Sequence, residues 1–430
     1  MKKTIIFSGM ITVLLALVAF GGEETYSEVN KDTNGYDLQE ILTIAMENNP
    51  RLKSLKLELE AADARIVQSG LWPNPVFTAE SENFSGDLPG FTYTENTFSV
   101  VQPLLLGGKI HLQKKLSEQE RLILTYTYEA EKIALIRDIE HAVYHVLVTE
   151  QVLEHARESQ EIARKLYDFM KGTMKIKDSD YSRHEMLSAQ IELSQAELDI
   201  TDAAGDVEIA KKTLSLLCGG QEILLTAIKG DLDRKFTIPE YTVLQECILK
   251  NNFKVKSAEA YEKRASIVLK IAQADRIPDV DLGFGVRQFE EDNSYTFVAG
   301  LSVPLPLFNR NQGGIQDAAI NKDKVLLDKK IVVNDLLIQL NTDYKEYQIS
   351  LKQVASYKNS ILPAAQEYYD VTVNRYENGS LQYLDVLLAE RKLIETKQNY
   401  AKALHTLQNA VANLENLCSQ HFHGMQGAEF

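Results

Sequence analysis

The sequence repeats itself at an interval of about 200 residues, and this duplication limits the possible folds more than any other feature. Short segments recur in the same order in both halves of the chain. Three matched pairs are NNPRLKS (48–54) with NNFKVKS (251–257), TFSVVQPLLLGGKI (97–110) with TFVAGLSVPLPLFNRNQGGI (296–315), and EMLSAQIEL (185–193) with DVLLAERKL (385–393). The sequence therefore predicts two tandem copies of one structural unit.

The helical segments of each copy carry the hydrophobic spacing of a coiled coil. Apolar residues follow each other in steps of three and four, the narrow seam of helices that pack side by side. In the first copy this seam is Met186, Ala189, Leu193, Ala196, Ile200, Ala203, Val207, Ala210, Leu214 and Leu217. In the second copy it is Val386, Ala389, Leu393, Thr396, Tyr400, Ala403, Leu407, Ala410, Leu414 and Leu417. Alanine at alternate seam positions allows a neighbouring helix to approach closely.

Two short regions have a period of two instead and are predicted to form β-hairpins. In residues 279–304, apolar and polar residues alternate on both sides of the polar turn 290–293. The residues expected on the apolar face are Val280, Leu282, Phe284, Val286, Tyr295, Phe297 and Leu301. Residues 77–84 and 91–103 repeat the pattern more weakly in the first copy. The predicted elements of the first copy are a helix (38–70), two strands (73–84 and 91–103), a very long helix (109–172) and a further helix (181–217).

Four strands per chain raise the question of what covers their apolar faces. An exposed apolar sheet edge is not tolerated in water, and the smallest membrane barrels have about eight strands. Two chains together would supply eight strands and three would supply twelve, of which only the larger set leaves an open lumen. The alternative is a soluble sheet that packs against the chain's own helices.

The N-terminus and the charge restrict the location and the partners. Residues 1–21 join two lysines to an apolar run and are expected to be a cleaved signal peptide, with a membrane anchor as the alternative. The formal net charge of −15 argues against binding to nucleic acid. Three cysteines (Cys218, Cys247 and Cys418) do not make a disulfide framework, and three buried thiols are expected, with one bridge as the alternative.

With its duplicated hairpins, seamed helices and prolines between strands and helices, the chain resembles the outer-membrane efflux (TolC-like) family. Within that family it is most similar to the members that serve heavy-metal cation pumps. The resemblance implies a mainly α fold with a β-barrel portion, in which a homotrimer forms a 12-stranded barrel in outer-membrane lipid, continued by a helical barrel in the periplasm. It also implies a periplasmic adaptor and an inner-membrane proton-driven (RND-type) pump as partners, no enzymatic activity and no cofactor. The implied domains are a signal peptide (1–21), a first efflux repeat (22–218), an equatorial linker (219–240), a second efflux repeat (241–418) and a C-terminal tail (419–430).

The resemblance also indicates which residues could do the work of a duct. The periplasmic aperture candidates are Asp385 and, at the matching position of the first copy, Glu185. Leu388 stands where a second acid is expected, and Ser179 replaces an expected glycine. The alternative for both acids is an ordinary first-turn helix residue, and for Glu185 this alternative is favoured. The residues expected to form the hairpin tips and contact the adaptor are Asp178, Ser179, Tyr181, Arg375, Tyr376, Gly379, Tyr383 and Leu384.

A metal site is not expected from the sequence. His141 and His145 are four residues apart on one helix, but a third ligand is not apparent, because His155 lies about 15 Å further along the helix axis. The leading interpretation is a passive outer-membrane exit duct, with heavy-metal cations as the favoured cargo. The alternatives are a duct for drugs or secreted peptides and a periplasmic coiled-coil adaptor.

Overall fold

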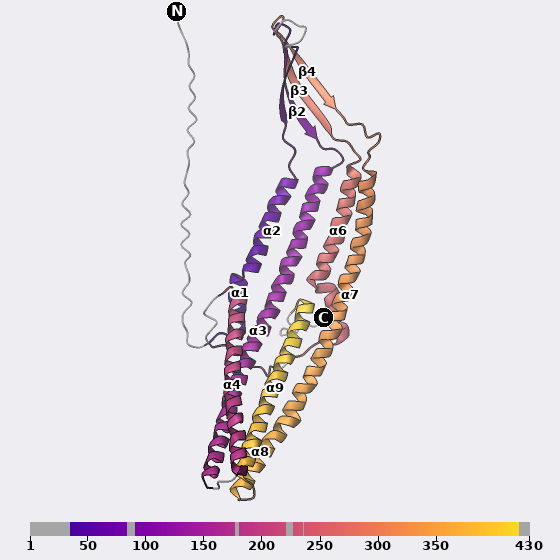
Figure 1. Cartoon of the computed structure of the whole chain (residues 1–430). Coiled ribbons are helices and arrows are strands. Elements are labelled where there is room, and N and C mark those ends of the chain that lie inside the picture. The colour runs from indigo at the N-terminus through magenta and orange to yellow at the C-terminus, as the bar shows by residue number, and fades with distance from the viewer. Residues whose placement is uncertain (1–34, 84–90, 177–179, 221–226, 235, 421–430) are drawn as a thin grey trace, which may run out of the picture. The chain divides into compact units, whose positions relative to one another are not determined.

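The computed structural model describes residues 35–83, 91–176, 180–220, 227–234 and 236–420, and its helices and strands belong to one compact unit, Tyr36–Phe430 (Figure 1). Residues 173–182 and 185 are described by their backbone at most. The predicted signal peptide and most of the predicted C-terminal tail lie outside the described residues.

Both copies follow the same order of elements. The first copy comprises α1 (Leu38–Asn48), α2 (Pro50–Ser69), β1 (Val76–Glu82), β2 (Glu95–Leu104), α3 (Lys109–Ile176) and α4 (Asp180–Leu217). The second comprises α5 (Tyr241–Asn251), α6 (Phe253–Ala274), β3 (Val280–Phe289), β4 (Ser294–Ser302), α7 (Gln312–Ser356), a π-helical turn (Tyr357–Ile361), α8 (Leu362–Glu377) and α9 (Tyr383–Cys418). The 68 residues of α3 span on the order of 100 Å.

The single helix predicted for residues 38–70 is wrong, because the chain breaks at Asn49. Asn49 has an extended backbone, and its side-chain oxygen accepts hydrogen bonds from the backbone N–H groups of Arg51 and Leu52, so it caps α2. Its Nδ2 donates to the carbonyl of Leu217 at 2.9 Å. In the second copy Asn252 makes the equivalent bond to Leu417 at 2.7 Å. Because both copies break at Asn, this cap explains the break better than Pro50, which only the first copy has.

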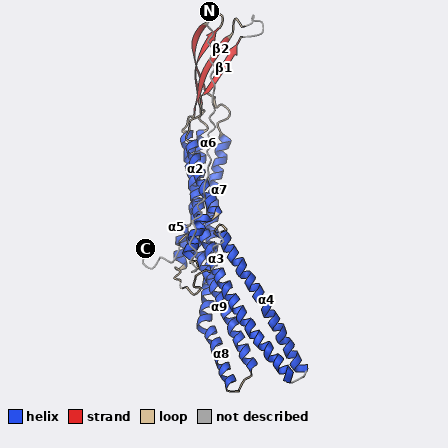
Figure 2. Cartoon of the chain, turned by 90° about the vertical axis from the view of Figure 1, so that its left-hand side faces the viewer, coloured by secondary structure: helices blue, strands red, loops and turns tan. Residues whose placement is uncertain are grey.

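The four strands form one antiparallel sheet in the order β1-β2-β3-β4, so the two hairpins pair with each other through β2 and β3. The predicted hairpin 279–304 is confirmed as β3 and β4. The sheet lies at one end of the unit, and α2, α3, α6 and α7 extend from it (Figures 1 and 2). On α9, the predicted seam is buried almost throughout, against α3 and α7. Among the described residues, no helix has both the length and the apolar composition needed to cross a membrane.

Candidate functional site

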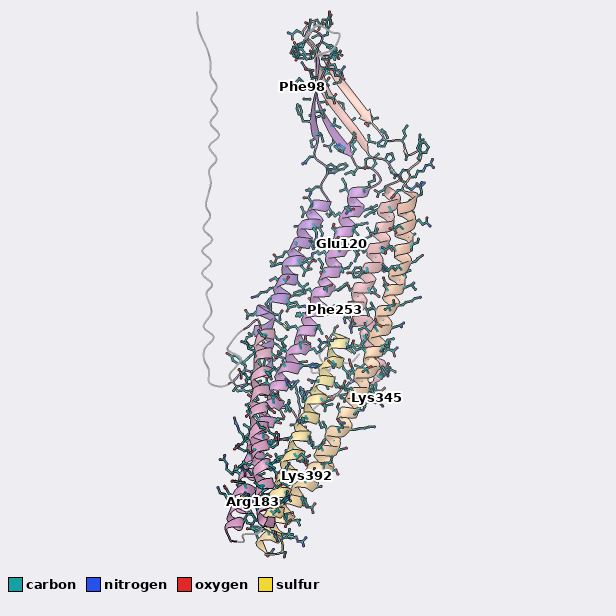
Figure 3. The ribbon with its side chains drawn as sticks, viewed as in Figure 1. Phe98, Glu120, Arg183, Phe253, Lys345 and Lys392 are labelled. Carbon is teal, nitrogen blue, oxygen red and sulfur yellow. The ribbon has the colours of Figure 1, made fainter. Side chains whose placement is uncertain are left out.

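The α3–α4 and α8–α9 pairs both end at the part of the unit that is remote from the sheet (Figure 2). Figure 3 places Arg183 and Lys392 toward this end and Phe98 on the sheet. A small apolar cluster joins the two pairs. Its buried members are Ile162, Leu166 and Met170 of α3, Ala189 of α4, and Leu387 and Ile394 of α9, with Tyr383 and Leu384 packed against them. We call this group the tip cluster.

Gly379 shapes the turn between α8 and α9. It has a φ of +70°, which residues with a Cβ adopt only at a cost in energy. Its N–H donates to the carbonyl of Tyr376, and the N–H of Ser380 donates to that of Arg375, both at 2.8 Å. This is the Schellman arrangement, which satisfies the last carbonyls of a helix. Arg375 and Tyr376 are thereby held on the exposed side of the turn.

Gly379→Ala is expected to destabilise this turn by ~1 kcal/mol, because alanine is strained at positive φ. Hydrogen exchange of the amides in residues 374–382 should accelerate about fivefold. Gly172→Ala is the matched control, since Gly172 lies in α3 with open space around it and no positive φ. That change should leave stability unchanged or raise it. Equal acceleration by the two variants would contradict the assignment.

Asp385 lies in the first turn of α9, where its carboxylate has a structural partner. Its Oδ2 accepts a hydrogen bond from the backbone N–H of Gln382 at 2.9 Å, which caps the helix. The side chain is half-buried, and Leu388 one turn later is 48% exposed. An aperture role for Asp385 stays a prediction. In the first copy, Glu185 and Tyr181 lie on α4 but their side chains are outside the described residues, as are Asp178 and Ser179 altogether.

Three contacts at the tips were not predicted from the sequence. The ring of Tyr383 lies 5.4 Å from that of Phe169 on α3 and 5.7 Å from that of Tyr376, so it connects α9 with two other helices. Arg391 of α9 forms an ion pair with Glu192 of α4. The α3–α9 and α4–α9 contacts each join a residue of the first copy to a residue of the second. The sequence around either residue contains no pattern that predicts such a contact.

The predicted apolar face of the sheet is exposed. All seven predicted residues lie on β3 or β4, and the register places them on one face, with Val286 between Phe98 and Phe297 and Leu282 opposite Leu301. Phe297 is 90% exposed and Phe284 is 60% exposed. The opposite face is polar and mainly acidic. Its charged residues are Glu80, Glu82, Glu95, Asp281 and Arg287.

Arg287 is held within that acidic face. Its guanidinium lies 2.8 Å from a carboxylate oxygen of Glu95 and 3.7 Å from one of Glu82, and its Nε donates to Thr97. The face carries four carboxylates and one guanidinium, of which only the carboxylates of Glu82 and Glu95 lie next to Arg287, so the polar face keeps a net negative charge. Such a face attracts cations.

The structure adds a third histidine beside the pair that the sequence analysis singled out. His405 of α9 lies with its ring 5.5 Å from that of His145, and Asn409 bridges the group by hydrogen bonds to His405 and His141. Burial, followed by the neighbouring histidines, lowers the pKa of His405 to about 4, so its ring is neutral near pH 7. Among the described residues, no group of three His, Cys, Asp or Glu side chains is placed to hold a metal ion.

Comparison with known proteins identifies the class of molecule to which this architecture belongs. A sequence model of the outer membrane efflux protein family matches residues 41–220 and 244–419, one range in each copy. The chain is thus a member of the outer membrane efflux protein family and belongs in the outer membrane.

Several individual proteins are similar to this chain over most of its length. The chain is 24% identical over 384 residues to the cobalt-zinc-cadmium resistance protein CzcC of Cupriavidus metallidurans, covering 88% of this chain and 89% of the relative. It is 24% identical over 394 residues to the cation efflux system protein CusC of Escherichia coli, covering 85% and 84%. Crystal structures of CusC share its fold with a TM-score of 0.73 at 18% identity, covering 89% of this chain and 92% of that one. The outer-membrane channel OprN also gives a TM-score of 0.73, at 16% identity and 90% coverage of both chains.

Proposed function

We propose that this chain is the passive exit duct of a tripartite system that exports heavy-metal cations. Three copies would form a 12-stranded barrel in the outer membrane and continue it as a helical tunnel into the periplasm. Cargo would arrive from an inner-membrane proton-driven (RND-type) pump through a periplasmic adaptor. At the periplasmic end of this tunnel, an acidic aperture would control passage and the two hairpin tips would contact the adaptor.

The observation that carries the proposal is the sheet. Its apolar face is exposed, and within the described residues its edge strands β1 and β4 pair on one side only. A sheet with such edges is completed by another chain, and pairing of β4 with β1 of the next copy closes a barrel. Three four-stranded sheets give twelve strands, wide enough for a lumen.

The choice of metal cations rests on two further observations. The names of CzcC and CusC describe resistance to, or efflux of, metal cations. The polar face of the sheet, which would line the lumen, holds four carboxylates and one guanidinium per chain. Three copies would multiply this negative field and concentrate cations over anions. Family membership disfavours the alternative of a periplasmic adaptor, and the relatives' names favour metals over drugs or peptides.

At the other end of the tunnel, the aperture would be formed by the first turns of α9. One Asp385 from each copy would place a ring of carboxylates around the axis, and Glu185 would add a second ring from α4. The exposed turn at Arg375, Tyr376 and Gly379 would meet the adaptor, together with residues 178–181 and 383–384. The Schellman geometry of Gly379 supports this role because it fixes the shape that a partner would recognise.

Asp385→Asn tests the aperture in planar bilayers. Asparagine removes the charge but keeps an oxygen that can accept the hydrogen bond from Gln382, so the cap of α9 is maintained. Each carboxylate contributes ~1 kcal/mol to holding a cation in water, so we expect block by divalent cations from the periplasmic side to weaken by roughly tenfold or more.

Glu377→Gln is the control, because it removes an exposed acid from the neighbouring turn. It should change the block much less than Asp385→Asn. If the purified chain conducts but Asp385→Asn leaves both the conductance and the block unchanged, Asp385 is a helix cap alone. If the trimer conducts no ions at all, the proposed duct fails.

A further inference from the structure

Two cysteines from distant parts of the second copy share one contact. Cys418 is the last residue of α9 and is fully buried, and its Sγ donates to the carbonyl of Leu244 on α5 at 3.9 Å. Cys247 lies one turn further along α5, and its Sγ donates to the carbonyl of Cys418 at 3.8 Å. Cys247 thus contacts Cys418 although the residues are 171 positions apart, and the two side chains also interact with each other.

The first copy shows that packing alone does not require both thiols. Cys218 ends α4 as Cys418 ends α9, and it too is buried. The residue of α1 that corresponds to Cys247 is Ile44, which packs against the same cluster as Cys218. An isoleucine thus fills the space that Cys247 fills in the second copy, and the second copy differs by having a thiol there.

The surroundings of the two thiols give them different reactivities. Cys247 is half-buried, and its interaction with the Cys418 side chain, together with the hydrogen bond from Asn251 Nδ2, lowers its pKa against the opposing effect of burial. Burial raises the pKa of Cys218 to about 12, and the hydrogen bond with Cys247, followed by burial, raises the pKa of Cys418. Cys247 is therefore the more reactive thiol and the one that solvent reaches, and Cys418 is the buried thiol in contact with it.

We propose that Cys247 and Cys418 form an intramolecular disulfide after export, which links α5 to α9 in the second copy alone. The outer-membrane location of the family places these thiols on the oxidising side of the inner membrane. The oxidant is a small or protein disulfide. The Cys247 thiolate attacks one sulfur of that disulfide and releases the other as a thiolate. The Cys418 thiol then loses its proton and attacks the Cys247 sulfur, which expels the second thiolate. The oxidant gains the two electrons that the two thiols lose.

The cross-link would hold the C-terminal end of α9 against α5, inside an apolar cluster of the second copy. Around it lies the apolar cluster formed by Leu244 and Ile248 of α5, Leu336 and Leu340 of α7, and Leu414 and Leu417 of α9. A bond between residues 247 and 418 closes a loop that contains β3, β4, α7 and α8, so it restricts the unfolded chain over most of this copy. The first copy lacks an equivalent link.

The test counts thiols in the full chain, purified from outer membranes in detergent without reductant. After denaturation, a mass-adding maleimide should label one cysteine, Cys218, and prior reduction should raise the count to all three. In Cys247→Ile, which introduces the residue of the first copy, two cysteines should be labelled with or without reductant. Three labelled thiols in the unreduced wild type, or a disulfide that includes Cys218 or joins two chains, would overturn the proposal.

A second measurement addresses the consequence for stability. Reductant should lower the thermal unfolding midpoint of the wild type, whereas the midpoint of Cys247→Ile should not respond to it. Equal responses of the two proteins would contradict a stabilising link in the second copy.

Discussion

Replacing Phe297 with arginine is expected to abolish assembly of the chain in the outer membrane. Phe297 is 90% exposed at the middle of β4, on the face that carries Val286 and Phe98. If that face meets lipid, a guanidinium there costs ~2–4 kcal/mol near the middle of the bilayer. A trimer would carry three such arginines, so the free-energy cost would apply three times. The measurement is the fraction of the chain recovered from outer membranes as a heat-sensitive trimer.

Val298→Arg is the matched control, because Val298 is the next residue of β4 and faces the other side of the sheet. Its neighbour across the sheet is Gly285, followed by Ser99 on β2, and the acids of that face lie further along the strands. Arginine there would face the water of the proposed lumen, on a face whose net charge is negative, and the trimer should form. Equal loss with both variants would indicate that neither face meets lipid. Equal survival would indicate that the sheet is covered by protein.

The sequence was sufficient for the order of helices and strands within the chain, because that order depends on patterns that repeat. The trimer and its 12-stranded barrel stay predictions. The period of two from Val280 to Leu301 determines which side chains share a face, and the structure has them on one face. The steps of three and four in α9 likewise predict its buried side. The break at Asn49 was missed because an Asn cap leaves the hydrophobic period on both sides intact. The boundaries predicted for the two repeats stay predictions.

Less of the candidate site than of the fold could be predicted from the sequence. Gly379 could be predicted as a turn residue because few other residues adopt its positive φ. The role of Asp385 could not be decided, since an acid in a first helical turn serves equally as a cap and as a charge at an aperture. Contacts such as Tyr383 with Phe169, or Cys247 with Cys418, join segments that no local pattern relates.

The second large effect is expected from Leu387→Ala in the tip cluster. Leu387 is only 2% exposed and belongs to the cluster with Ile162 and Leu166 of α3 and Ala189 of α4. Removing its buried methyl groups should destabilise the contact by ~2–5 kcal/mol, because the helices can only partly close the cavity. The same helix end carries Arg391, whose ion pair with Glu192 depends on the approach of α4 to α9.

Trypsin cleavage after Arg391 and Lys392 measures this loosening, because the cleavage rate follows the population of the opened state. We expect cleavage to accelerate at least about 30-fold in Leu387→Ala, which corresponds to ~2 kcal/mol. Leu388→Ala is the control, since Leu388 is 48% exposed and its truncation should change the local stability by no more than ~0.5 kcal/mol. If the two variants were cleaved equally fast, the tip cluster would not hold the hairpins together. The helix ends that carry Asp385 would then be positioned by contacts between chains.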